Sequence, residues 1–278
     1  ISGAMYAIGY SSDEILNESF KTNWDEAISN YKKRKDLFFF QKNDYDKYPV
    51  EFKFINNTPQ PPMALTNGHA TYMSLNEKIG IYETINNFDD FPIPFRCNAV
   101  DLLSGQEIIF KNGSLSKALR ASISIPSVFY PVKDNNLLLI DGGVSNNFPS
   151  DIAKNLGADI IIGINVSFIK KESSDINTVF DVLSQSILLN GFQKRIENLY
   201  YTDILIEPKN LDYSLLSFDE NTLNDIYRIG QKAAYQKIDK FIELKNKLNI
   251  QSQSIILSSI KNNDFTINEL IIKSKDNI

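Results

Sequence analysis

The chain has 278 residues, 42% of them hydrophobic and 12% aromatic, which is enough for one large core, or for one domain plus a small appendage. Its formal charge is −5 and its pI is about 5.1, a mildly acidic balance that argues against a nucleic-acid partner. The single cysteine, Cys97, excludes an internal disulfide framework and a cysteine-rich zinc site, and its simplest interpretation is a small buried hydrophobe.

The single histidine, His69, narrows the chemistry further. Zinc sites usually take several histidine or cysteine ligands, so we expect no zinc enzyme, no metal site and no cofactor. A Ser-His-Asp triad would have to use His69, which lies in ALTNGHATYM, a stretch whose composition predicts a loop. No apolar run reaches the roughly 18 residues that span a bilayer.

The first 94 residues predict mostly helices. Residues 1–9 are typical of the end of a buried helix that Gly9 stops, and Ser11 or Ser12 can cap the helix that follows. The basic run Lys32 to Lys35 is most simply an exposed helix end, with contact to a membrane surface as the alternative. Further along, three segments predict a strand, a second strand and a helix: LFFFQ, VEFKF and YMSLNEKIGIYETI.

From residue 95 onward, short apolar segments alternate with helical ones. The predicted strands are FRCNAVDL, NLLLI, DIIIGINVSF and DILIEP. The predicted helices are SLSKALRASISI, which Pro126 stops, PSDIAKNLGA, which runs from Pro149 to Gly157, and two long ones over residues 177–201 and 220–248. This alternation predicts an α/β fold in three α/β/α layers, with a mainly parallel sheet and helices on both faces.

The main chemical signal is a strand that ends on an acid, in NLLLIDGGVSNNFPS. Ligands of parallel sheets gather outside the carboxyl ends of the strands, where Asp141 would meet a substrate or a catalytic partner. Gly142 and Gly143 allow a sharp turn and a close approach of other backbone. Asp-Gly and Gly-Gly also favour hairpin turns, but the residues that follow predict a loop and a helix instead of a second strand.

The other sequence motifs that we considered give weaker evidence for a catalytic or nucleotide-binding residue. SLSK, Ser114 to Lys117, matches Ser-x-x-Lys, but the Lys-Thr-Gly and Ser-Asp-Asn elements that accompany it elsewhere are missing from the sequence, so Ser114 is better interpreted as a helix N-cap. The sequence contains neither Gly-x-Ser-x-Gly nor Gly-x-Gly-x-x-Gly.

Three stretches in order, SLSKALRASISIPSVFYPV, LLLIDGGVSNNFP and AKNLGADIIIGINVS, resemble the second half of patatin-like phospholipases. That family carries an Ala-Ser-x-x-x-Pro-x-x-Phe segment, an Asp-Gly-Gly or Asp-Gly-Ala motif and an Asn-x-Pro element. They correspond here to Ala121, Ser122, Pro126 and Phe129, then Asp141, Gly142 and Gly143, then Asn147 and Pro149. The opening ISGAMYAIGYSSDEI resembles the helix after the family's nucleophile elbow, and the likeness covers about residues 1–248.

The resemblance implies a lipid acyl hydrolase, a phospholipase or carboxylesterase with a Ser-Asp dyad that needs no histidine. Asp141 would be the general base, which takes the serine proton and later activates the deacylating water. Aspartate is a weak base in water, and burial beside the hydroxyl raises its basicity.

The sequence departs from the family at the nucleophile. The resemblance places the elbow serine roughly four residues before Ile1, and the glycine-rich oxyanion loop earlier still. Because the first residues have neither an initiator methionine nor the basic start of a signal peptide, we expect the chain to begin inside a domain of a complete enzyme.

Two domains are predicted, a hydrolase domain over residues 1–248 and, over 249–278, a linker with the start of a second module that is similar to a POTRA module. That likeness implies a bacterial protein that is secreted or located at the outer membrane, with the cytoplasm as the alternative. The expected partners are a phospholipid or another acyl ester and a membrane surface. An apolar stripe in residues 177–200 predicts core, or else the lining of an acyl groove.

Two rival functions stay open. One is a non-catalytic lipid-binding or interaction module of the same fold that has lost its nucleophile. The other is a nucleotide-binding α/β domain, which predicts phosphate-binding glycine loops that the sequence does not contain. A Gly-x-Ser-x-Gly just before Ile1 would favour the enzyme.

Overall fold

A computed structural model describes residues 1–29, 38–39, 53–55, 57–60, 63–167, 176–177, 182, 185–186, 189, 191–209, 213 and 218–249. Its α-helices are α1 (Ser2–Ala7), α2 (Ser12–Lys21), α3 (Trp24–Ser29), α4 (His69–Ile79), α5 (Leu115–Ser122), α6 (Ser150–Asn155), α8 (Phe192–Leu199), α9 (Glu220–Tyr235) and α10 (Ile238–Lys247). Short 3-10 helices are η3 (Gly80–Thr84), η4 (Phe88–Asp90) and η5 (Gly142–Val144). The strands are β1 (Lys53–Ile55), β2 (Thr58–Gln60), β3 (Cys97–Asp101), β4 (Glu107–Phe110), β5 (Val132–Asp134), β6 (Leu137–Asp141), β7 (Ile162–Ile164) and β8 (Ile204–Ile206).

The largest sheet has the strand order β4-β3-β6-β5, and each of its three pairings is antiparallel. Only β7 and β8 pair in parallel among the described strands. The combination of helices and sheets agrees with the predicted α/β class, but the prediction of a mainly parallel sheet is not confirmed. The alternation of strand and helix did not predict the strand directions, because two tight hairpins interrupt it and pair their strands antiparallel.

These hairpins bring in β4 and β5, two strands that the sequence analysis did not identify. The β3–β4 turn contains Gly105 at φ +73°, and the β5–β6 turn contains Asn135 at φ +52°. Both residue types tolerate the left-handed region that tight hairpin turns require. The local signals, Ser-Gly after one strand and Asp-Asn-Asn before the other, were therefore present in the sequence.

Several predicted helix ends are confirmed. Gly9 and Gly157 adopt φ values of +103° and +90° just after α1 and α6. Ser11 caps α2 in a capping box with Glu14, each side chain bonding the other residue's main-chain N–H. Ser114 caps α5 by accepting a hydrogen bond of 3.1 Å from the N–H of Lys117, as predicted.

Other boundaries differ from the prediction. His69 is the first residue of α4 and does not lie in a loop; the N–H of His69 donates to the side chain of Asn67 over 2.9 Å. α5 ends at Ser122, before Pro126. The last predicted helix is divided into α9 and α10 at Lys237, whose φ and ψ of −107° and 9° leave the helical region. No proline or glycine marks that junction, so local composition did not predict it.

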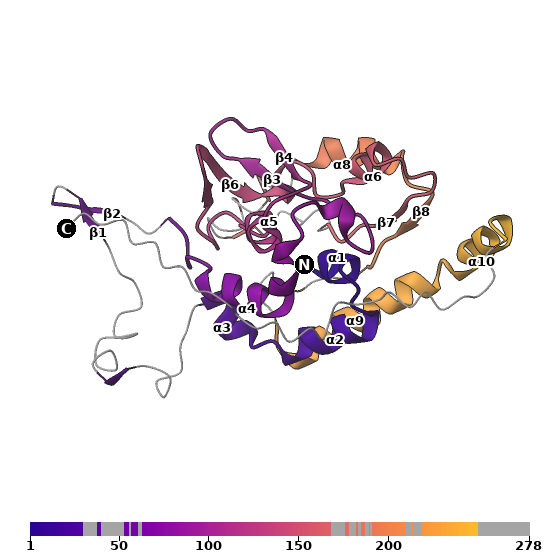
Figure 1. The fold of residues 1–278 in the computed structure, drawn as a ribbon, viewed down its shortest axis with the longest axis horizontal. Coiled ribbons are helices and arrows are strands. Elements are labelled where there is room, and N and C mark those ends of the chain that lie inside the picture. The colour runs from indigo at the N-terminus through magenta and orange to yellow at the C-terminus, as the bar shows by residue number, and fades with distance from the viewer. Residues whose placement is uncertain are drawn as a thin grey trace.

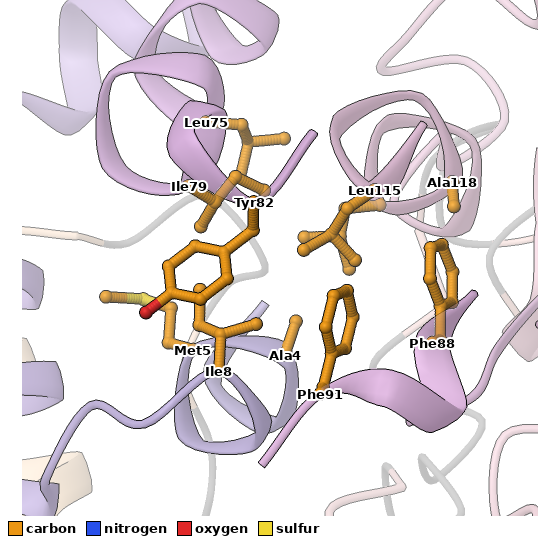
Figure 2. Close-up of a cluster of buried hydrophobic side chains, with 11 residues drawn as sticks. Ala4, Met5, Ile8, Leu75, Ile79, Tyr82, Phe88, Phe91, Leu115 and Ala118 are labelled. Carbon is orange, nitrogen blue, oxygen red and sulfur yellow. The ribbon is translucent and has the colours of Figure 1, made fainter. Parts of the chain in front are cut away.

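The principal apolar core lies among α1, α4, α5, η3 and η4, and we call it the helical cluster. Figure 2 shows Ala4 and Met5 of α1, and Ile8 directly after it, facing Leu75 and Ile79 of α4 and Tyr82 of η3, with Phe88 and Phe91 beside Leu115 and Ala118. The small side chain of the fully buried Ala4 lets α1 pack closely here.

Packing joins the cluster to the large sheet. α5 packs against β3 and β6 on one side and against α4 on the other, and α4 packs against α3. In Figure 1 the sheet, the middle helices and the outer α2, α3 and α9 are accordingly seen as successive levels. Within the described ranges, none of the helices combines the length and the apolar character that a bilayer crossing requires.

Some predictions lie outside the described residues. These are most of the LFFFQ strand, of which only Phe38 and Phe39 are described, the basic run at 32–35, most of the apolar stripe in 177–200, and all but the first residue of the C-terminal module over 249–278. The division into two domains, and the outer-membrane or secreted location inferred from it, therefore stay predictions.

Candidate active site

Asp141 is the last residue of β6, where it pairs with Ala99 of β3. Its main-chain N–H donates to the carbonyl oxygen of Ser124 over 3.0 Å. Its carboxylate accepts a hydrogen bond of 2.7 Å from the N–H of Gly143. Backbone and side chain are thus both held, and the chain turns directly into η5 instead of into a second strand.

The surroundings of Asp141 favour its neutral form. Burial raises the pKa of Asp141 to about 6, against the opposite effects of the Gly143 hydrogen bond and of the positive amino group of Ile1. The same proximity acts on Ile1: burial lowers the pKa of its amino group, while Cys97 and Asp141 counteract that shift. The start of α1 is thus near enough to Asp141 for the two charges to interact, and Figure 1 shows this end of the chain near the centre of the view.

The two positions after Asp141 leave no room for a side chain, so both require glycine. A Cβ on Gly142 would lie 2.5 Å from the carbonyl oxygen of Asn98 and 2.4 Å from its side chain. A Cβ on Gly143 would lie 2.8 Å from the side chain of Asn147 and 3.1 Å from the carboxylate of Asp141. The Asp-Gly-Gly sequence thus lets the loop press against β3 while the carboxylate folds back on its own backbone.

A buried polar network lies beneath this loop. The side-chain amide of Asn98 donates to Glu107 over 2.7 Å and to the carbonyl oxygen of Asn146 over 3.0 Å. Asn146 donates in turn to Glu107 over 3.1 Å. The main-chain N–H of Asn146 donates to the carbonyl oxygen of Gly142 over 2.9 Å. The network therefore ties β3 and β4 to the loop that carries Asp141.

The network continues into α6 and α8. The buried amide of Asn198 donates to Asn146 over 2.9 Å and to Asp151 over 3.0 Å. Burial pushes the pKa of Asp151 upward, but hydrogen bonds from Lys194 and Asn146 outweigh it and hold this pKa below its usual value. The ion pair between Lys194 and Asp151 measures 2.8 Å and closes the network at its outer end.

The segment from Ala121 to Phe129 includes the end of α5 and leads towards β5, the strand that pairs with β6. Its anchor is Arg120, whose buried guanidinium donates to Ser124 over 2.6 Å and lies 4.8 Å from the centre of the Phe129 ring. Arg120 also donates to the carbonyl oxygens of Gly68, Asn67 and Tyr130. Burial lowers the pKa of Arg120 to about 10, which leaves it charged at neutral pH.

The remaining residues that the sequence analysis considered for catalysis or metal binding make only local contacts or are exposed. Ser114 is a helix cap, and Lys117 forms an ion pair of 2.6 Å with Asp134. His69 is exposed at the start of α4. Burial raises the pKa of the Cys97 thiol to about 12, so this residue is a thiol at neutral pH.

The sequence analysis did not identify Asn98, Glu107, Arg120 or Asn198. Asn146 lies in the stretch NLLLIDGGVSNNFPS, but the sequence analysis singled out its neighbour Asn147 as part of the Asn-x-Pro element. Asn147 is exposed, whereas Asn146 is buried. A polar residue inside an apolar strand, such as Asn98 in FRCNAVDL, is the signal that could have indicated a buried network.

Comparison with known proteins gives the class of the molecule. The family model described as "Patatin-like phospholipase" matches residues 1–154, more than half of the chain, so the chain belongs to this family. The matched range contains α1, the large sheet and the Asp141 loop.

Individual relatives are lysophospholipases and NTE-family proteins. "Lysophospholipase nte1" of Aspergillus fumigatus is 28% identical over 216 residues, which are 68% of this chain and 14% of the relative. "Lysophospholipase NTE1" of Phaeosphaeria nodorum is 30% identical over 124 residues, 44% of this chain and 8% of the relative. An uncharacterized NTE family protein of Mycobacterium bovis is 37% identical over 122 residues, 43% of this chain and 20% of the relative. The chain thus spans less than a quarter of the length of these relatives.

Proposed function

We propose that the protein is a lipid acyl hydrolase, of the phospholipase or carboxylesterase type, in which Asp141 is the general base of a Ser-Asp dyad. The observation that supports this proposal most directly is the environment of the Asp141 carboxylate. The carboxylate is held by Gly143, its pKa is raised to about 6 by burial, and it is near enough to the start of α1 for the two charges to interact. A carboxylate with such a pKa is mostly ionised at pH 7 yet is a stronger base than free aspartate.

The nucleophile in this proposal is a serine that precedes Ile1. Its oxygen attacks the ester carbonyl while its proton passes to the Asp141 carboxylate; the ester C–O bond breaks, and the alcohol leaves with a proton. The acyl-enzyme then reacts with a water molecule whose proton Asp141 accepts, and the carboxylic acid and the free serine are released. No metal or redox partner takes part in either step.

The substrate class is supported by the family and by the printed names of the fungal relatives, which are lysophospholipases. We extend this to the present chain as a proposal: the substrate is a phospholipid, a lysophospholipid or another acyl ester, met at a membrane surface.

A fluorophosphonate probe tests the proposal on the full-length protein, because it labels only an activated serine. Replacing the serine of the upstream elbow should abolish labelling. Asp141→Asn should lower ester turnover by about 10²–10⁴-fold, the usual contribution of a general base. Asp13→Asn, an exposed carboxylate in the first turn of α2, is the matched control and should leave turnover unchanged.

Full turnover in Asp141→Asn would refute the assigned base. Lipid binding without any labelling or turnover would favour the alternative, a non-catalytic lipid-binding module of the same fold.

The pH profile gives a second test. Asp141 must be ionised to accept a proton, so kcat/KM should rise with pH and level off above a pKa of about 6. In the full-length enzyme of this proposal a peptide bond replaces the amino group of Ile1, so its positive charge is absent and the rise should lie at a pH above 6. A rise centred near pH 4 would contradict the desolvated environment.

A further inference from the structure

Arg120 is a buried cation of α5 that has no carboxylate partner among the residues that the structure describes. It is only 5% exposed. Four hydrogen bonds hold its guanidinium, and all four acceptors are neutral: the hydroxyl of Ser124 and the carbonyl oxygens of Asn67, Gly68 and Tyr130. Burial of a charge is costly unless hydrogen bonds compensate it, and a guanidinium compensates by donating in several fixed directions. The arrangement therefore indicates that Arg120 holds parts of the main chain in place.

One arm of the guanidinium leads to the main chain of Asp141. Nη1 of Arg120 donates to Oγ of Ser124 over 2.6 Å, and this hydroxyl donates in turn to the carbonyl oxygen of Arg120 over 2.8 Å. Ser124 is fully buried, and its own carbonyl oxygen accepts the hydrogen bond of 3.0 Å from the N–H of Asp141. A single residue thus links the guanidinium to the proposed general base.

The other nitrogens fix the guanidinium against a neighbouring loop. Nε donates to the carbonyl oxygen of Gly68 over 3.3 Å, and Nη2 donates to those of Asn67 over 3.0 Å and Tyr130 over 3.3 Å. The loop is joined to the same region because the N–H of Tyr130 donates to the carbonyl oxygen of Thr66 over 2.9 Å. A Cβ on Gly68, whose φ is +70°, would lie 2.2 Å from Nη2 of Arg120. The loop therefore fits closely around the guanidinium and leaves it little freedom to move.

Ser124 is one of three residues that fix Asp141. Ala99 pairs with Asp141 in the sheet, and the N–H of Gly143 donates to its carboxylate over 2.7 Å. Ser124 lies just beyond the end of α5 and outside the strands, so its position depends on the turn that Arg120 holds. A misplacement of a catalytic group by about 1 Å can cost about 100-fold in rate. The link from Arg120 to Ser124 is therefore placed where it can affect the reaction.

We propose that Arg120 is a positioning residue for Asp141: it holds Ser124, and Ser124 holds the main chain of the base at the start of the Asp-Gly-Gly loop. This inference rests on the proposed function for its reaction, and it adds a residue that acts on the base through one intermediate side chain. Loosening either link should lower kcat and leave KM nearly unchanged.

Ser124→Ala is the mildest test, because it removes one oxygen and keeps the carbonyl that Asp141 uses. With p-nitrophenyl butyrate as the ester, kcat of the folded full-length protein should fall about ten-fold, and KM should change by less than about two-fold. Arg120→Lys keeps the positive charge but loses the fork, and should lower kcat at least as much. Lys117→Gln is the matched control: Lys117 lies on the same helix and forms an ion pair with Asp134, and its replacement should leave kcat unchanged.

A double-mutant cycle separates positioning from ordinary stabilisation of the fold. If Arg120 acts through Ser124, the variant that carries both changes should lose no more kcat than Arg120→Lys alone. Losses that multiply would mean that the two residues act independently, and would overturn the proposal. Normal kcat in both single variants would overturn it as well. Circular dichroism gives the folded fraction of each variant, so that kcat refers to folded protein only.

An NMR titration distinguishes this inference from the proposed function. The carboxyl ¹³C signal of Asp141, assigned by its loss in Asp141→Asn, should titrate at lower pH in Ser124→Ala than in the wild type, because a loosened carboxylate is better solvated. If this shift is seen but Asp141→Asn keeps full turnover, the positioning stands and the assigned base falls. If Asp141→Asn is inactive but Ser124→Ala changes neither the titration nor kcat, the base stands and the positioning falls.

Discussion

The helical cluster and the polar network beneath the Asp141 loop are both buried, but they are held together by different forces. The cluster joins α1, α4, α5, η3 and η4 through apolar side chains (Figure 2), whereas the network joins β3, β4, α6 and α8 through amides and carboxylates. Apolar burial is non-directional and scales with area, while hydrogen bonds fix distances and angles. The cluster therefore chiefly supplies stability, and the network chiefly supplies position.

The comparison matters because the strand and the loop that carry Asp141 are attached to both regions. Its strand packs on α5, which carries the cluster, and its loop is tied down by Asn98 and Asn146. Mutations in the cluster should change how much protein is folded, and mutations in the network should change how well the folded protein works.

The largest effect on stability is expected from Phe88→Ala. Phe88 is fully buried and stacks on Phe91 at 5.2 Å, so its removal leaves a cavity and should lower the free energy of unfolding by about 3–5 kcal/mol. Urea denaturation measures this. Phe54→Ala, a residue that is 69% exposed, is the control and should change stability by less than about 0.5 kcal/mol. Similar losses in both variants would contradict the assignment of the core.

Asn146→Ala should cost less stability but more function. It leaves Glu107 and Asp151 short of one donor each and Asn198 short of an acceptor, at a cost of about 1–3 kcal/mol. Because the Asp141 loop loses its support, kcat of the folded full-length enzyme should fall at least ten-fold with little change in KM. The neighbouring exposed Asn147 offers the control for stability, since Asn147→Ala removes no buried partner. Normal kcat in Asn146→Ala would show that the network only stabilises the fold.

Asp141→Asn should stabilise the protein at neutral pH, by up to about 2 kcal/mol. The pKa of Asp141 is raised to about 6 in the folded state, so the folded protein binds more protons than the unfolded chain between pH 4 and 6. The stability that the raised pKa of Asp141 contributes is thus fully present below pH 4 and is lost as pH rises through 6, whereas the neutral asparagine has no such loss. Urea denaturation at pH 4 and pH 8 should show no difference at the first pH and a stabilised variant at the second. A variant that is less stable at pH 8 would mean that the carboxylate is well solvated.

The smallest effect is expected at the α2 cap, outside both regions. Ser11→Ala removes the acceptor for the N–H of Glu14 and should cost about 1 kcal/mol. Ser12→Ala is the control, because Ser12 is the first helical residue and makes no cap. Thermal unfolding of the two variants gives the comparison directly; equal melting temperatures would show that the capping box contributes nothing.

Much of the fold was readable from local patterns. Residues 1–9 indicated the buried α1, and serines and glycines marked the ends of α1, α2, α5 and α6. These features depend on residues within one turn of each other, so the sequence determines them directly. The sheet was less predictable because strand direction depends on hairpin turns, and the turns at Gly105 and Asn135 were not recognised.

For the candidate site, the sequence by itself determined the Asp-Gly-Gly loop at the end of an apolar strand, since only glycine fits against Asn98 at position 142. Only the tertiary structure decided the raised pKa of Asp141 and the network from Asn98 to Lys194. The physical reason is that desolvation and directed hydrogen bonds arise between residues that are dozens of positions apart. No local pattern records such distances.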